Sequence, residues 1–323
     1  MTSRNHLLLL LLPVLLLAGC SADDHFLAQD PAAAEASVSD KRARPKEPNQ
    51  VVGLSYAVTK KTSVDMVFTD LTARLAANEN IGIVAEIDHA ANAASVGREL
   101  RPTSVVLFGN PNLGTPLMQL NPRAGLDLPQ KILVYQTNNK RTITAYNGTA
   151  YLGSRHGVED APTLPMIAGA LHNLTATVSG SEVAVDEGTV ERDAGIRTVP
   201  ATGAVDEVYA RLRAVIDGNP NLRIIAELDH QANAARVGLE LSPIRLIVFG
   251  NPNLGTPLMR EAQSVGIDLP QKMLVYQTAD GGTEIIWNDP FFLAGRHGIP
   301  TTLPQLSTIA GALINIANAA TQP

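Results

Sequence analysis

The 323-residue chain has little of what nucleic-acid-binding proteins need. Aromatic residues make up 4% of it, and its 25 Lys and Arg residues are outnumbered by 31 Asp and Glu, giving a formal net charge of −6. Proteins that bind nucleic acid usually neutralise phosphates with an excess of Lys and Arg, and many stack bases on aromatic rings. We therefore expect no nucleic-acid partner.

Cysteine is nearly absent as well, since Cys20 is the single one in the chain. No intramolecular disulfide and no thiolate metal site can therefore form. No Gly-Lys-Ser/Thr follows the Gly-Asn-Pro turns, which excludes a phosphate-binding loop of that type. The apolar run from Leu7 to Leu17 is too short for a standard membrane span but suits a signal peptide.

The apolar run ends in Leu17-Ala18-Gly19-Cys20, which resembles the bacterial lipobox. This resemblance implies that residues 1–20 are a lipoprotein signal peptide and that Cys20 is lipidated, as the protein's anchor in the membrane. The resemblance also implies that Ser21, in place of Asp, favours the outer membrane, with the protein facing the periplasm. A plain signal peptide with a chance cysteine is the alternative. Residues 21–49 are rich in Ala, Asp, Lys, Arg and Pro without hydrophobic periodicity, which predicts a flexible tether.

The rest of the chain is organised around a segment that occurs twice. Phe-Gly-Asn-Pro-Asn-Leu-Gly-Thr-Pro-Leu-Met stands at 108–118 and again, unchanged, at 249–259. The same offset of 141 residues relates Asp88-His89 to Asp229-His230 and Arg155-His156-Gly157 to Arg296-His297-Gly298. A long self-match at fixed spacing predicts two copies of one domain. We place them at 50–177 and 192–320, with 178–191 as a linker.

Within the first copy, apolar patterns predict strands at 51–59, 81–87, 105–108, 132–136 and 142–146. Ser63 precedes an apolar stripe typical of an amphipathic helix, formed by Val64, Val67, Phe68, Leu71 and Leu75. Asp88 is expected to cap a short helix over 89–96. A further helix is expected to begin with Thr115 as its N-cap and Pro116 in its first position. Another is expected to end at Gly157.

The motifs together carry a family resemblance. The order Asp-His, Phe-Gly-Asn-Pro-x-x-Gly-Thr-Pro-Leu-Met, Leu-Pro-x-Lys-x-Leu-Val-Tyr, Asn-Asp-Pro and Arg-His resembles domain of unknown function 302, over 51–176 and 192–317. The resemblance implies an α+β fold of two tandem β-α-β(4)-α domains, similar in outline to the TATA-binding protein, each an antiparallel sheet with helices on one face. The first copy departs from the pattern at Gly148-Thr149. The family has no established activity, so it implies a fold and no reaction.

Polar residues that recur in both copies are the candidate site residues. As ligand-binding candidates we take Asp88, His89, Asn110, Lys131, Tyr135, Arg155, His156, Asp229, His230, Asn251, Lys272, Tyr276, Arg296 and His297. Capping accounts for Asp88 without any function, and a helix C-terminus favours the cations Arg155 and His156. Pure turn chemistry is the alternative for Asn110.

Several functions fit these residues. The first is an envelope binding module, whose Arg and His donors bind a small ligand, for example an anion, or a protein partner at paired sites. The second is an enzyme, hydrolase-like or other, with His89 or His156 as general base. The third is a metal or haem site built from Asp88, His89 and His156, although no cofactor is predicted. A purely structural envelope role is the fourth. The duplication predicts that the two copies pack as a pseudo-dimer.

Overall fold

The computed structural model describes residues 48–59 and 62–323. The expected signal peptide, the lipidation site Cys20 and the tether up to residue 47 lie outside the described residues. A short 3-10 turn, η2 (Pro48–Gln50), precedes the first sheet. Within the described ranges, no helix has the length and apolar character needed to cross a membrane.

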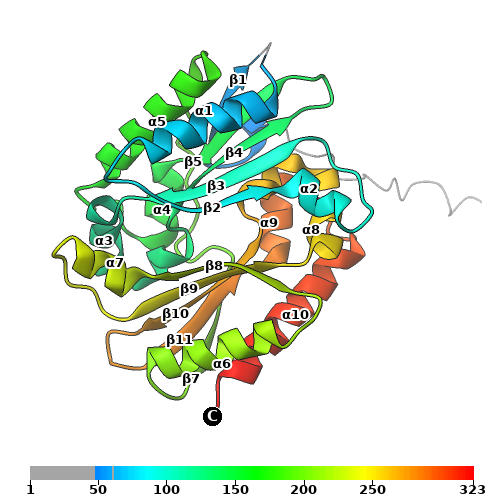
Figure 1. The fold of residues 1–323 in the computed structure, drawn as a ribbon. Helices are drawn as coiled ribbons and strands as arrows, with labels where there is room; N and C mark the ends of the chain where they lie inside the picture. Colours follow the sequence, from blue (N-terminus) through cyan, green and yellow to red (C-terminus); the bar gives the residue numbers. More distant parts are fainter. Residues whose placement is uncertain (1–47, 60–61) are drawn as a thin grey trace, which may run out of the picture. The chain divides into compact units, whose positions relative to one another are not determined.

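The first repeat is an antiparallel sheet with two long helices on one face (Figure 1). The strands lie in the order β2-β3-β4-β5-β1-β6, so β1 pairs with β5, the second strand of the β4-β5 hairpin. The elements are β1 (Leu54–Thr59), α1 (Val64–Ala76), β2 (Gly82–Asp88), α2 (His89–Ala94), β3 (Thr103–Gly109), α3 (Pro111–Leu120), η3 (Pro122–Leu126), β4 (Gln130–Gln136), β5 (Thr142–Asn147), α4 (Thr149–His156), α5 (Leu164–Ser179) and β6 (Val183–Ala184).

The second repeat has a five-stranded sheet in the order β7-β11-β10-β9-β8, which matches the first sheet apart from β6. Even an irregularity recurs, because the register shifts at Ile83/Ala85 in β2 and at Ile224/Ala226 in β8. Its elements are β7 (Ile196–Ala201), α6 (Val205–Asp217), β8 (Arg223–Asp229), α7 (His230–Arg236), β9 (Ile244–Gly250), α8 (Pro252–Glu261), η4 (Gln263–Ile267), β10 (Gln271–Gln277), β11 (Thr283–Asn288), α9 (Pro290–His297) and α10 (Pro304–Ala320). The expected α+β class and antiparallel sheets are confirmed.

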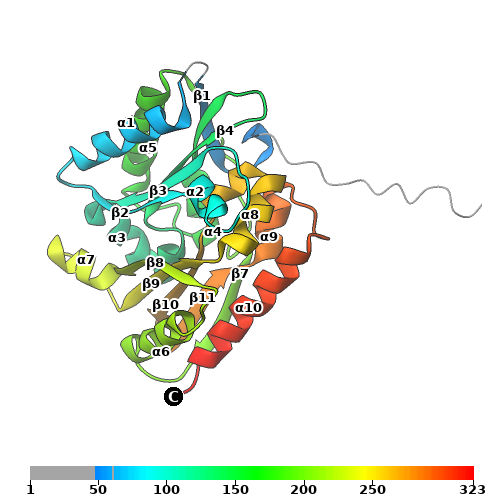
Figure 2. The ribbon, with the colours of Figure 1, turned by 45° about the vertical axis from the view of Figure 1, so that its right-hand side comes forward.

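The outer face of each sheet is covered by its two longest helices, α1 and α5 in the first repeat and α6 and α10 in the second (Figures 1 and 2). Ser63 caps α1 by accepting a hydrogen bond from the Met66 amide. The expected stripe is the buried face of α1, with Val67 and Leu71 essentially inaccessible. Burying such a stripe against a sheet is what makes a helix of this length stable.

The helix after the repeated turn begins earlier than expected. We expected Thr115 as N-cap with Pro116 next, whereas α3 has Asn110 as N-cap and Pro111 in its first position. The Asn110 side chain accepts from the Asn112 amide at 3.0 Å, and Pro111 lacks only an N–H that would have no partner within the helix. Because the Asn-Pro pair comes first along the chain, it starts the helix and leaves Pro116 inside it.

The inner faces of the two sheets pack toward each other, each with a 3-10 segment of the other repeat against it. A Cβ on Gly125 of η3 would lie 3.2 Å from the Leu274 side chain of β10. Likewise, a Cβ on Gly266 of η4 would lie 3.1 Å from Leu133 of β4. Glycine at these two positions therefore allows close approach between the repeats. One buried apolar cluster contains side chains from both sheets.

Residues 178–191, which we expected to be a linker, also contribute to the first sheet. The two residues of β6 pair with β1, placing Val183 opposite Ala57. Asp186 then accepts hydrogen bonds from the Gly53 and Gly188 amides, at 2.7 and 2.8 Å. The segment between the repeats is thus held against the first strand.

Candidate functional site

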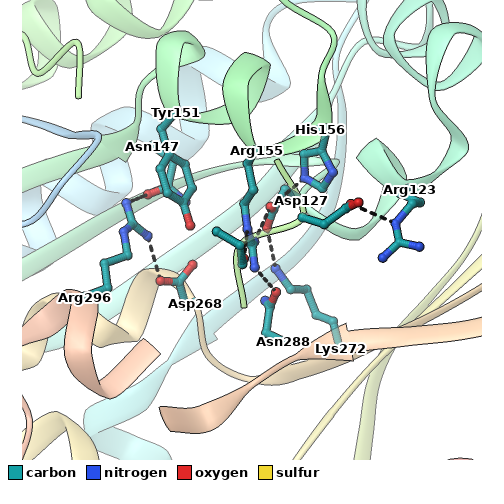
Figure 3. Close-up of polar contacts among 12 residues, drawn as sticks. Arg123, Asp127, Asn147, Tyr151, Arg155, His156, Asp268, Lys272, Asn288 and Arg296 are labelled. Carbon is teal, nitrogen blue, oxygen red and sulfur yellow. Dashed lines mark hydrogen bonds and ion pairs between the residues drawn. The ribbon is translucent and has the colours of Figure 1, made fainter. Parts of the chain in front are cut away.

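Six of the candidate residues meet where the two repeats pack, and Figure 3 labels four of them, Arg155, His156, Lys272 and Arg296. We call the group the interface cluster and define it as Asp127, Lys131, Asn147, Arg155, His156, Asp268, Lys272, Asn288, Arg296 and His297. Its charged and histidine side chains are at most 5% exposed. Such burial is rare for Lys, Arg and Asp unless they are paired.

Local structure explains why these side chains point to one place. Asp127 and Asp268 are the C-caps of η3 and η4, immediately before the strands that carry the lysines. Arg155 and His156 occupy the last turn of α4, which ends at Gly157 with φ +60°. That left-handed conformation is the usual way for a helix to end, and it suits glycine.

Each aspartate is paired with an arginine and a histidine of its own repeat. Asp127 Oδ2 accepts from Arg155 Nη1 at 2.6 Å and from His156 Nε2 at 2.9 Å. Burial alone would raise the pKa of Asp127, but Arg155, Lys272 and His156 outweigh burial and hold it well below its usual value. Burial lowers the pKa of His156 despite Asp127. The histidine is therefore a neutral donor to a charged carboxylate.

The second repeat repeats this arrangement. Asp268 Oδ2 accepts from Arg296 Nη1 at 2.8 Å and from His297 Nε2 at 2.9 Å. Burial opposes ionisation of Asp268 as well, yet Arg296 and His297 hold its pKa far below the usual value. Ser264 Oγ lies 2.9 Å from the other ring nitrogen of His297. Two equivalent Arg-Asp-His groups thus face one another across the interface.

The two arginines also cross between the repeats, in a reciprocal way. Arg155 Nη2 donates to Asn288 Oδ1 at 2.9 Å, and Arg296 Nη2 donates to Asn147 Oδ1 at 2.8 Å. The Arg296 guanidinium carbon lies 4.1 Å from the centre of the Tyr151 ring, a cation–π distance. Each guanidinium is therefore fixed by groups from both copies, and the Gly148-Thr149 departure leaves Asn147 in its position.

Lys131 and Lys272 complete the interface cluster from equivalent strands. Their Nζ atoms lie 3.9 and 3.5 Å from Asp127 Oδ1. Burial and the nearby Lys272 lower the pKa of Lys131 to about 7, while Asp127 and Asp268 oppose this shift. An amine in such a position is neutralised much more easily than an exposed lysine.

The Asp-His pairs lie elsewhere, at the starts of α2 and α7. Asp88 and Asp229 cap these helices, each accepting from a backbone amide at 2.8 Å. His89 Nε2 lies 3.2 Å from the Gly266 carbonyl oxygen of the other repeat, and His230 is buried beside the Gly125 backbone. Burial lowers the pKa of both histidines to about 4. They too contribute to contacts between the repeats.

Tyr135 and Tyr276 lie on the same strands as the two lysines, β4 and β10, but near the opposite ends of these strands. Tyr276 donates to Glu284 and accepts from Arg123, and burial together with Glu284 raises its pKa. Tyr135 is buried, with Thr103 and Ile143 as its neighbours in the sheet. Neither tyrosine joins the interface cluster.

Asn251 and His89 border a separate cavity of about 90 Å3. It lies among the end of β9, the start of α8, the helix α10 and, from the first repeat, α2. Most of its wall is apolar, with Phe249, Met259 and Leu313 among the lining side chains. Thr256 and Gln271 also line it, and their side-chain polar atoms are buried with no hydrogen-bond partner in the described part of the chain.

The structure adds residues that the sequence reasoning missed. Asp127 and Asp268 are central to the interface cluster, yet neither was among the candidates. The signal was available, because Asp-Leu-Pro-Gln-Lys stands at 127–131 and again at 268–272. Across residues 48–59 and 62–323, no three His, Cys, Asp or Glu side chains are grouped as metal ligands would be.

Comparison with known proteins finds relatives of one part of the chain. It is 36% identical over 107 residues to "Fluoride-specific ion channel FluC 1" of Brucella suis, covering 33% of this chain and 42% of that protein. The match to the protein of the same name from Brucella abortus has the same identity and covers 39% of it. The chain thus spans about two fifths of the length of these curated relatives.

A solved structure and a family model extend the comparison. The structure is an uncharacterized conserved DUF302 protein from Bacillus stearothermophilus, 23% identical, with a TM-score of 0.32 over 39% of this chain and 95% of that one. The model for domain of unknown function DUF302 matches residues 56–174 and again residues 197–319. Because these two matches cover most of the chain, the protein belongs to the DUF302 family, as a tandem pair of its domains.

Proposed function

We propose that this protein is a binding protein for a small, mostly apolar molecule, with its site in the cavity beside α8. The observation that carries the proposal is the pair of unpartnered buried polar side chains, Thr256 and Gln271, in an otherwise apolar wall. Small-molecule sites usually combine an apolar lining with a few fixed polar groups that orient the ligand. A buried polar group without a partner costs about 1–3 kcal/mol, so a ligand that satisfies it gains affinity.

The repeated segment supports the same site. Asn251, Leu254, Gly255, Thr256 and Met259 all belong to the second copy of the eleven-residue motif and line the cavity. In the first copy, Thr115 Oγ1 and Gln130 Nε2 are likewise buried without a partner within the described ranges. The repeat therefore offers a second, equivalent pair of polar groups, and we propose paired sites.

The size of the cavity limits what it can hold. An apolar cavity of roughly 150 Å3 accommodates one benzene ring, so about 90 Å3 admits a group smaller than a six-membered ring. We propose a branched three- or four-carbon group with one hydroxyl or amide. The rest of a larger ligand would leave the cavity near Asn92 and Arg223, which also line it.

Isobutanol and isobutane are suitable probes because they differ by the hydroxyl. We expect both to shift methyl resonances of Met259 and Leu313, with the alcohol binding more tightly. Thr256→Val should reduce that preference without loss of stability, because the Thr256 hydroxyl has no partner to lose. Equal affinity of the two probes for wild-type protein would show that the polar groups do not select a ligand.

A matched pair of variants tests the location. Ala312 lines the cavity, whereas Ala170 has the same place in the Ile-Ala-Gly-Ala-Leu segment of the first repeat and is exposed. Ala312→Phe should abolish the probe-induced shifts of Met259 and Leu313, and Ala170→Phe should leave these shifts unchanged. Retained shifts in Ala312→Phe, in a protein that still unfolds cooperatively, would exclude this cavity.

We propose further that the protein works at the bacterial envelope, anchored through Cys20. The sequence Leu17-Ala18-Gly19-Cys20 supports this location. Metabolic labelling with an alkyne analogue of palmitate should label the wild-type protein and not the Cys20→Ala variant. Unlabelled wild-type protein in a bacterial envelope fraction would overturn this part of the proposal.

A further inference from the structure

Lys131 and Lys272 hold an unusual position within the interface cluster. Their side chains are 5% and 4% exposed, and each Nζ lies within 4 Å of Asp127 Oδ1. Figure 3 shows Lys272 beside Asp127. Neither ammonium has a hydrogen-bond partner in the described part of the chain, and Asp127 Oδ1 has none either. Both lysines come from equivalent positions, so two buried cationic groups approach each other at the interface.

The interface cluster contains more positive than negative charge. With Lys131 protonated, Arg155, Arg296, Lys131 and Lys272 contribute four cations, against the two carboxylates of Asp127 and Asp268. His156 donates as a neutral ring, so it does not change this balance of charge. Buried charge is very costly unless it is balanced.

The interface cluster also has more hydrogen-bond donors than acceptors. Each lysine ammonium has three N–H donors and no acceptor. Both Oδ2 atoms, of Asp127 and Asp268, are already used by an arginine and a histidine. A water molecule here would accept two hydrogen bonds but would bring two more donors. A small anion would bring acceptors only, and a negative charge with them.

We propose that Lys131 and Lys272 together bind one small monovalent anion at the interface between the two repeats. A halide suits the position best, because it is compact and needs no particular orientation. The anion lies beside the two ammonium groups, on the side away from the Asp127 carboxylate. It reduces the excess charge and links a strand of the first repeat to the equivalent strand of the second. This site is separate from the cavity beside α8.

The test is anion-dependent stability of the purified protein. Thermal unfolding is followed in sodium fluoride, chloride, bromide and gluconate at one ionic strength, kept constant with gluconate. We expect a saturable rise in the midpoint with at least one halide and none with gluconate, since a ligand that binds only the folded state stabilises it. Lys131→Met and Lys272→Met should each weaken that halide effect by at least about tenfold in concentration. Lys140→Met, at an exposed position, should leave it unchanged.

A second measurement covers the case in which a lysine variant fails to fold. Wild-type crystals grown in sodium bromide should show an anomalous peak within hydrogen-bond distance of Lys131 and Lys272 Nζ. The proposal is overturned if no halide gives a saturable effect, or if the effect persists in both lysine variants. It is also overturned if the bromide crystals have no anomalous peak between the lysines, which would mean that loss of a lysine proton balances the charge instead.

Discussion

Buried histidines in this protein are poor candidates for a general base. His89 and His230 have pKa values lowered to about 4 by burial, whereas an efficient base has a pKa near the working pH. His156 and His297 each engage an aspartate through Nε2. Their contacts join the repeats or fix the aspartates, which favours the structural and binding hypotheses over the enzyme hypothesis.

The lowered pKa values predict acid sensitivity. In the folded state His89 and His230 stay neutral down to about pH 4, whereas in the unfolded chain histidine takes up its proton near pH 6.5. The unfolded state therefore binds more protons between these values, so stability falls as pH falls from 6.5 to 4. At pH 5 the loss should be about 2 kcal/mol for each histidine.

Urea unfolding at pH 7 and pH 5 measures this effect. The double variant His89→Gln, His230→Gln should lose less stability between the two pH values than wild type, while His172→Gln, at a partly exposed position, should behave like wild type. An unchanged pH dependence in the double variant would show that these imidazoles do not cause the acid sensitivity.

At the scale of single elements, local signals in the sequence were sufficient for most boundaries. Ser63 and Asp88 cap the helices they were expected to cap, and Gly157 ends α4. The helix α3 was placed too late because Asn110-Pro111 and Thr115-Pro116 are both valid start signals, and local chemistry does not rank them. The sequence also could not show that Pro129 lies close to Gly109. A Cβ at position 109 would be only 3.3 Å from the Cβ of Pro129.

The N-cap residues of α3 and α8, Asn110 and Asn251, should contribute measurably to the stability of the protein. Asn110 and Asn251 each accept from the amide two residues later, at 3.0 and 2.9 Å. Replacing an N-cap Asn by Ala typically costs about 1 kcal/mol, so Asn110→Ala and Asn251→Ala should each lower the free energy of unfolding by about that amount.

The motif itself provides the control for this prediction. Asn112 and Asn253 are the second residues of the same helices and both are exposed, so their replacement by Ala should cost less. Urea unfolding of the four single variants makes the comparison. If Asn251→Ala keeps full stability but loses probe binding in the cavity, the residue serves the ligand more than the helix.

For the whole molecule, the sequence predicted the duplication and the sheets but could not predict how the copies join. The strand at 105–108 is apolar at every position, and in the structure all four residues are buried. A sheet with helices on only one face needs another cover for its second face, and here the other repeat supplies it. No periodicity relates Leu133 to Gly266 or Arg155 to Asn288, because such contacts join residues far apart in the chain.

This interface predicts that neither repeat is stable alone as a monomer. A fragment ending at residue 191 would expose Leu133 and leave Arg155 without Asn288, and a fragment beginning at residue 192 would expose Leu274. Losing one partner of a buried charge group is costly, typically about 3–5 kcal/mol. We expect each fragment to aggregate or self-associate when expressed alone, and the two to form a one-to-one complex when co-expressed.

Light scattering after gel filtration distinguishes these outcomes. The intact chain should unfold in urea in a single transition, because both sheets share one apolar cluster and the reciprocal arginine contacts. Asn288→Ala should weaken the co-expressed complex, since it leaves Arg155 with one fewer acceptor, whereas Asn219→Ala, away from the interface cluster, should not. A monomeric, cooperatively folded single repeat would mean that the sheets need no partner, and that the buried charges serve a ligand more than they serve assembly.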